Sequence, residues 1–236
     1  MVILIPIAVI ATFLYPSQET NTSQDTDQSF EQIKKEAEAG DAKAQLSLGL
    51  MYMNGDGVER DDHQGYDWIS KSAKQGDSEA QAVMGSMYLF GEGVEQDYSQ
   101  AFYWTKKSAE NGDAEAQFTL ALMYIEGSGT EVNNEQAIYW YEKSAEQNHA
   151  EAQAMLGSLY FAGDVVEMDL AKSFYWGKKS AEQGRAQSQF NLGILYFFGY
   201  GTEVDKKKAA DWIKKAHDKG YQPATDFLDE FELWEH

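Results

Sequence analysis

The chain has 236 residues, 43% of them hydrophobic and 14% aromatic, which is enough for a sizeable core and excludes a disordered protein. Its net charge is −20 and its pI is about 4.4. An acidic surface repels phosphate groups, so nucleic acid and anionic membrane surfaces are disfavoured as partners. The absence of cysteine excludes disulfides, thiolate nucleophiles and Cys-based zinc sites.

The N-terminal residues 1–15, MVILIPIAVIATFLY, are apolar and carry no charged side chain. A helix of this length spans about 22 Å, which is short of a hydrocarbon core of roughly 30 Å. The segment resembles the apolar region of a secretory signal or a marginal anchor, although a basic start and an A-x-A cleavage site are missing. The alternative is a hydrophobic end that docks on the fold. We expect a periplasmic or membrane-anchored protein that meets a membrane only through this segment, with secretion as the alternative.

Residues 16–29 are polar and acidic and predict a flexible linker. A pattern of 36 residues then repeats five times without insertion or deletion. The predicted repeats are 41–76, 77–112, 113–148, 149–184 and 185–220. Two columns of identical residues mark the period: Gln45, Gln81, Gln117, Gln153 and Gln189, and Trp68, Trp104, Trp140, Trp176 and Trp212.

Each repeat contains a glycine-rich stretch, such as GEGVEQD at 91–97, that resembles a phosphate or calcium loop. Such a loop is not expected at every step of a repeat, and the ligand order of an EF-hand is absent. The stretch is better explained as a turn. Gly91 ends a helix in the left-handed conformation, Gly93 lets the chain turn back, and Asp97 caps the next helix.

Repeat two therefore predicts a helix A over 79–90 and a helix B over 98–111, ended by Gly112. Gly85 within helix A indicates a close approach of the two helices. One hairpin cannot bury both its faces, but a stack of hairpins can, if its ends are capped.

The predicted fold is all-α, an array of five helix-turn-helix repeats between half-repeat caps over residues 30–228. Residues 30–40 match the end of a helix B, and the stretch from Pro223 to Leu228 matches the start of a helix A. Residues 229–236 predict an acidic, solvent-facing C-terminal tail.

The pattern A-x-A-Q-x-x-L-G-x-x-Y-x-x-G-x-G-V-x-x-D-x-x-x-A-x-x-W-x-x-K-S-A-x-x-G resembles the Sel-one-like repeat (SLR), a relative of the tetratricopeptide repeat. The resemblance covers about 30–228 and implies a right-handed α-solenoid whose concave face binds proteins, with no family-wide catalytic residues. Departures are Gly65 for the usual Ala, Ala121 for Gly, Val165 for the second turn glycine and His217 for Ala.

A partner-binding face should use positions that vary between repeats. Two such columns lie four residues apart on helix A, and their members are Leu46, Ala82, Phe118, Ala154 and Phe190, and Leu50, Ser86, Leu122, Ser158 and Ile194. The large apolar pairs of the odd repeats predict a groove for a peptide or an amphipathic helix. The candidate binding residues are Leu46, Leu50, Phe118, Leu122, Phe190 and Ile194. The alternative is that the columns alternate in size to fit packing between repeats.

Lysines also recur near the end of each helix B, at Lys71, Lys107, Lys143, Lys179 and Lys215. They could bind anions, but a favourable interaction with the helix dipole or exposure on the outer face explains them better. Lys206, Lys207 and Lys208 add one basic end to an acidic molecule, which could orient a charged partner or serve self-association, but a solvated helix start explains them better.

Catalysis is not expected. The four histidines lie in different repeats or in the tail, and neither HExxH nor G-x-S-x-G occurs. We expect no cofactor, no metal and no enzyme activity, and predict a protein–protein interaction scaffold of the bacterial cell envelope. One alternative is weak hydrolysis or binding of β-lactams and cell-wall peptides, which the resemblance associates with a cysteine-rich branch. The other is a secreted effector that acts on host proteins.

Overall fold

The computed structural model describes residues 23–233. This part of the chain contains twelve helices and no strand, and it is an all-α solenoid, as predicted. The helices are α1 (Ser23–Glu38), α2 (Ala42–Asn54), α3 (Asp62–Lys74), α4 (Ser78–Phe90), α5 (Tyr98–Glu110), α6 (Ala114–Glu126), α7 (Asn134–Glu146), α8 (Ala150–Ala162), α9 (Leu170–Glu182), α10 (Ala186–Phe198), α11 (Lys206–His217) and α12 (Gln222–Glu230).

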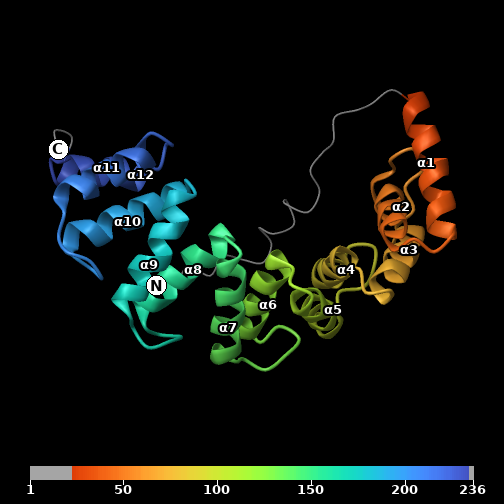
Figure 1. Ribbon diagram of the computed structural model, residues 1–236, viewed down its shortest axis with the longest axis horizontal. Helices are drawn as coiled ribbons and strands as arrows, with labels where there is room; N and C mark the ends of the chain where they lie inside the picture. Colours follow the sequence, from red (N-terminus) through yellow and green to blue (C-terminus); the bar gives the residue numbers. More distant parts are fainter. Residues whose placement is uncertain (1–22, 234–236) are drawn as a thin grey trace. The chain divides into compact units, whose positions relative to one another are not determined.

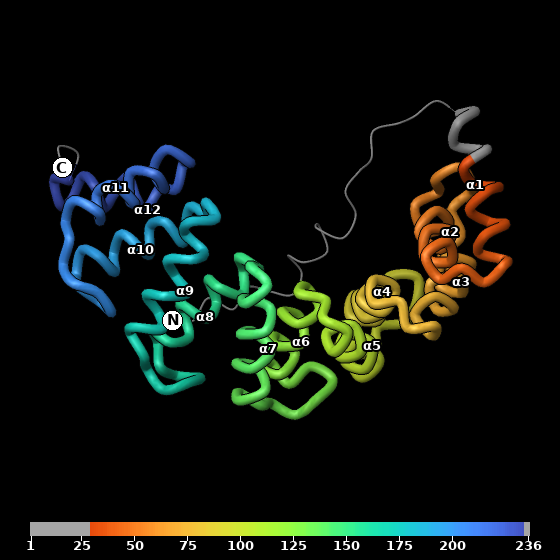
Figure 2. Tube along the Cα trace, in the orientation of Figure 1, coloured from red at the N-terminus to blue at the C-terminus, as the bar shows by residue number. Residues whose placement is uncertain are grey.

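The helices divide between two compact units, with α1–α6 in the N-terminal unit (Met1–Asn133) and α7–α12 in the C-terminal unit (Asn134–His236). Within each unit a helix packs mainly on its neighbours along the chain, as α2 does on α3 and α4 on α5 (Figure 1). The trace reverses at each turn to form these hairpins (Figure 2).

Repeat two shows why the turn sequence forms a hairpin. Gly91 follows α4 with a φ of 73°, and its amide donates to the Met87 carbonyl at 2.8 Å. The Asp97 carboxylate accepts from the amides of Ser99 and Gln100 at 2.8 and 3.0 Å, which caps α5. The turn interpretation is therefore confirmed, and helix-end hydrogen bonds explain the glycine and acid at these positions.

The close approach predicted at Gly85 is also confirmed. A Cβ atom placed there would lie 2.5 Å from the Thr105 Oγ1 of α5, well inside van der Waals contact. A side chain at residue 85 would therefore push the two helices of the repeat apart.

A buried glutamine on each helix A joins consecutive repeats. Gln153 is fully buried, and its Nε2 donates to the Ala145 carbonyl of the preceding helix B at 3.0 Å. Its Oε1 accepts from the Gln183 Nε2 at 2.8 Å, so both polar atoms are satisfied. The same donation is made by Gln45, Gln81, Gln117 and Gln189 to the residue eight positions earlier. We call this arrangement the glutamine joint.

The joint is incomplete in repeat five. Lys219 stands where the other repeats carry Gln or Asn, and its Nζ donates to the Gly184 carbonyl. The Gln189 Oε1 is buried and has no hydrogen-bond partner. A buried acceptor without a donor lowers stability, so this joint is weaker than its counterparts.

Two boundaries predicted from the sequence need correction. α1 begins at Ser23, so the last seven residues of the expected linker 16–29 are helical. Burial of Phe30 and Ala37 anchors α1, and a helix extends cheaply from an anchored turn when no proline interrupts it. At the other end α12 continues to Glu230, and Leu233 is 2% exposed in the core, so the tail predicted from 229 is not wholly solvent-facing.

The half-repeat caps are confirmed. α12 starts with Pro223 in its first turn and buries Ala224 and Leu228 completely. The apolar segment 1–15 and the first part of the linker lie outside the described residues. Among residues 23–233, no helix combines the length and apolar character that a membrane span requires.

We expect Lys219→Gln to stabilise the protein. A glutamine there can donate to both the Gln189 Oε1 and the Gly184 carbonyl, as Gln183 does to Gln153 and Asn148 one repeat earlier. The expected gain is about 1 kcal/mol in the free energy of unfolding, measured by urea denaturation. The control, Lys207→Gln, removes the same charge at an exposed site, and an equal gain there would show that charge alone is responsible.

Candidate interaction surface

The structure places three of the six predicted binding residues in the core. Leu46 is 5% exposed, and Phe118 and Leu122 are each 4% exposed, so none can contact a partner without repacking. The prediction of a groove at these three positions is therefore wrong, and the packing alternative holds for them. Leu46 belongs to one core cluster with Val83 and Met84. Large and small residues alternate along the column because packed layers must fill space without overlap.

The other three predicted residues, Leu50, Phe190 and Ile194, are half-buried. Phe190 packs against the rings of Tyr221 and Phe227, with centroid distances of 5.5 and 5.9 Å. It therefore helps to hold α12 on α10, and a role in partner binding at these three residues remains a prediction.

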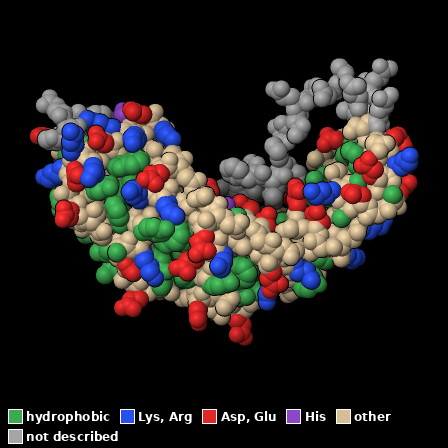
Figure 3. Space-filling model, in the orientation of Figure 1, with side chains coloured by type: hydrophobic (Ala, Val, Ile, Leu, Met, Phe, Trp, Pro, Cys, Tyr) green, Lys and Arg blue, Asp and Glu red, His purple; other side chains and the backbone are tan. Residues whose placement is uncertain are grey.

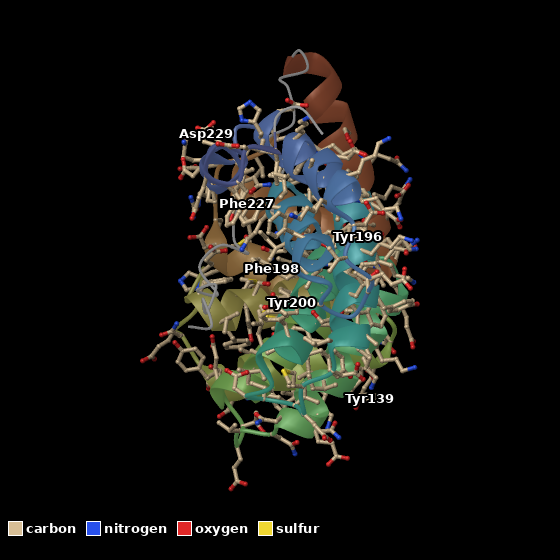
Figure 4. The ribbon with its side chains drawn as sticks, turned by 90° about the vertical axis from the view of Figure 1, so that its left-hand side faces the viewer. Tyr139, Tyr196, Phe198, Tyr200, Phe227 and Asp229 are labelled. Atoms are coloured by element: carbon tan, nitrogen blue, oxygen red, sulfur yellow. The ribbon has the colours of Figure 1, made fainter. Side chains whose placement is uncertain are left out.

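A different apolar surface is exposed on the C-terminal unit. We call it the aromatic strip, and its members are Phe161, Phe197, Phe198, Tyr200, Phe227 and Phe231. Phe161 is 43% exposed, Phe198 47%, Tyr200 36% and Phe231 38%, and the other two are half-buried. Figure 4 shows Phe227, Phe198 and Tyr200 one after another along the same side of the unit. Hydrophobic side chains gather on the visible face of this unit in the space-filling view (Figure 3).

Ring contacts connect the strip from one helix to the next. Phe161 at the end of α8 meets Tyr200 edge-on at 5.6 Å, and Tyr200 stacks on Phe198 at 5.5 Å. Phe197 lies 5.0 Å from Phe198 and 5.0 Å from Phe231. These contacts fix the rings before any partner arrives, which lowers the entropic cost of binding.

One residue of the sequence indicates the strip, but it lies outside the two variable columns of helix A from which the binding residues were predicted. Tyr200 follows the helix-ending glycine of repeat five. The residues at the same position of repeats one to four are Asp56, Glu92, Ser128 and Asp164. A tyrosine at a position that is otherwise small or acidic marks this turn as different. Phe198 is a weaker signal, because the same position holds Asn54, Glu126 and Ala162 but also Phe90.

The recurring lysines of helix B lie in the last turn of their helices, as expected from the helix dipole, and they also cover aromatic rings. Lys71 lies 3.6 Å from the centroid of the Trp68 ring, and Lys107 lies 5.1 Å from that of Tyr103. These cation–π contacts explain the lysine column without an anion ligand.

Two tyrosine hydroxyls have raised pKa values. The hydroxyl oxygens of Tyr66 and Tyr88 lie 2.8 Å apart, and burial together with this hydrogen bond raises the pKa of Tyr88 to about 12. Burial and the hydrogen bond to Glu142 also raise the pKa of Tyr160. Both phenols are neutral at physiological pH, and their hydroxyls make hydrogen bonds between helices. Residues 23–233 contain no cluster of three or more His, Asp or Glu side chains arranged to hold a metal.

The arrangement defines a helical repeat protein built from stacked helix-turn-helix units. The Sel1 repeat family profile matches residues 42–77, 78–113, 114–149, 150–184 and 186–221, and the chain belongs to this family. Each match starts one residue after the predicted start of its repeat. Four of the five also end one residue after the predicted end, and the fourth ends at residue 184, as predicted. Sel1 repeat proteins are generally non-catalytic scaffolds for protein–protein interaction.

Two solved structures are similar over most of the chain. One is c5321, a protective antigen present in uropathogenic Escherichia coli strains, with 40% identity and a TM-score of 0.79 over 83% of this chain. This chain spans only 42% of c5321. The other is a Sel1 repeat protein from Oxalobacter formigenes, with 28% identity and a TM-score of 0.77, covering 83% of this chain and 81% of that one. None of the curated proteins matches this chain.

Stability measurements should separate the core column from the strip. We expect Phe118→Asp to lower the free energy of unfolding by about 3–5 kcal/mol, since it removes a buried ring and introduces a carboxylate. Tyr200→Asp should lower it by only about 1 kcal/mol, because it removes two ring contacts at a turn position where two other repeats carry Asp. Urea denaturation followed by circular dichroism measures both, and equal losses would mean that Tyr200 is also a core residue.

Proposed function

We propose that the chain is a protein-interaction scaffold that binds a segment of a partner protein at the aromatic strip of its C-terminal unit. The observation that carries this proposal is the exposure of four aromatic side chains in a continuous set of ring contacts. Exposed apolar patches of this kind are typical of protein-binding surfaces, and aromatic side chains dominate their binding energy.

The repeat architecture supports this function. Identical residues at fixed positions maintain the stack, while residues peculiar to one repeat are free to serve recognition. Tyr200 is of the second kind, because no other repeat carries an aromatic residue at its position, whereas Phe198 shares its position with Phe90 of repeat two. The repeats position the strip, and residues found in one repeat only, such as Tyr200, contribute to its chemistry.

We also propose an exported or membrane-anchored location. The support is the apolar segment 1–15 followed by polar residues. The similarity to c5321, described as a protective antigen, agrees with a protein accessible from outside the cell. Neither β-lactam hydrolysis nor effector activity has a specific observation in its favour, and the chain has no cysteine.

The strip can be tested by restoring residues from other repeats. In the full chain, Phe198→Asn introduces the residue of repeat one, and Tyr200→Asp the residue of repeats one and four. We expect the double variant to keep its circular dichroism spectrum and to lose at least about 90% of partner recovered by cross-linking and affinity capture from envelope extracts. The matched control is Tyr175→Asp, which changes a tyrosine 50% exposed outside the strip to the residue found at Asp67 and Asp211.

The two variants together decide the outcome. A partner lost from the double variant and kept by Tyr175→Asp supports binding at the strip. Retention by both would place the binding surface elsewhere, and loss from both would indicate general stickiness of exposed aromatic rings.

A further inference from the structure

The chemistry of the aromatic strip restricts the partner that it can take. Five of its six members are phenylalanines, so the Tyr200 hydroxyl is the single side-chain polar group of the strip. A carbohydrate or nucleotide ligand needs several hydrogen-bond donors and acceptors at its site, because its own polar groups must stay paired when water leaves. The strip therefore favours apolar side chains.

Exposed charges next to the strip are mainly acidic. Asp164 lies three residues after Phe161, and Glu203 lies three residues after Tyr200. Glu230 and Glu232 flank Phe231 on both sides. All four acids are exposed. Each of these acids lies within three residues of a strip ring along the chain, so Lys or Arg beside the apolar side chains of a partner segment will be attracted.

The nearby lysines do not reverse this balance. Lys206 approaches the strip, with its Nζ 5.5 Å from the centroid of the Phe197 ring. Lys208 forms an ion pair with Asp205 at 3.0 Å and points toward the Tyr196 ring, which is not part of the strip. One lysine therefore contacts a ring of the strip and its neighbour Lys207 is exposed, while four exposed acids lie within three residues of a strip ring in sequence.

The net charge of the chain also favours a basic partner. At −20 it repels a second copy of the same chain and also anionic lipid headgroups. A basic partner is attracted at long range, and this attraction raises the rate at which the two proteins meet.

We infer that the aromatic strip recognises an amphipathic protein segment whose apolar side chains are flanked by Lys or Arg. This inference rests on the proposed function, because it names the chemistry of the partner that the strip binds. The acidic neighbours select the segment, and the rings hold it.

The test uses the full chain and two synthetic peptides of equal length. Both carry the same Leu and Phe positions at helical spacing, and their flanks are Lys in one and Glu in the other. Fluorescence anisotropy of the labelled peptides at low salt should show binding of the Lys peptide at least about tenfold tighter than the Glu peptide. The preference should shrink as salt is raised, since screening weakens the exposed charges.

Protein variants assign the preference to the strip. Tyr200→Asp with Phe198→Asn should abolish binding of the Lys peptide, and Asp164→Lys should weaken it. Lys206→Glu should tighten it, because this change removes the lysine that contacts a strip ring. The matched control is Lys43→Glu, the same charge change on an exposed residue of α2 in the other unit, and it should leave the affinity nearly unchanged.

The outcomes separate this inference from the proposed function. Equal affinity for both peptides, lost in the strip variant, would overturn the charge preference and leave the strip as a binding surface. Preference for the Glu peptide, or binding of neither peptide, would overturn the inference. Strip-dependent binding to phosphatidylglycerol vesicles, or strip-dependent dimerisation in sedimentation velocity, would assign the surface to a membrane or a second copy.

Discussion

The fold depends on the hydrogen bonds of the buried glutamine at each joint between repeats. A solenoid has few contacts between residues distant in sequence, so each repeat is positioned by its immediate neighbours. Apolar packing alone tolerates small slips, whereas a buried amide must find its carbonyl or remain unsatisfied. The donation from Gln153 to the Ala145 carbonyl therefore fixes the register of two helices, and its recurrence carries that register along each unit.

The interaction surface depends on that register. Phe161, Phe198 and Phe231 belong to different repeats, and their rings connect because consecutive repeats are stacked with one fixed offset. Binding residues in such an array need not be close in sequence or repeat with the period. They need only lie at the same edge of neighbouring repeats, in this case the edge where helix A ends and the turn begins.

The sequence predicted the array because residues with a structural role recur every 36 positions. This recurrence was enough to predict the helix cap at Asp97 and the close contact at Gly85. It did not predict the recognition surface. A column of large and small residues such as Leu46 and Ala82 has the same pattern whether it lines a groove or fills a core, and burial decides between them. The strip was missed because Tyr200 does not follow the repeat pattern and because its ring contacts form only in the folded protein. The start of α1 at Ser23 and the burial of Leu233 depend on packing, which the local sequence pattern does not indicate.

The unsatisfied Gln189 Oε1 has a dynamic consequence. In a linear array each joint opens at its own free-energy cost, and local opening begins where that cost is lowest. The repeat that carries Phe198 and Tyr200 contains the joint with a missing hydrogen bond, so its amides should exchange with solvent sooner than those of repeat four. A partner that spans from Phe161 to Phe231 would tie repeat five to its neighbours and suppress this opening. Recognition and rigidity are thereby linked at the same end of the molecule.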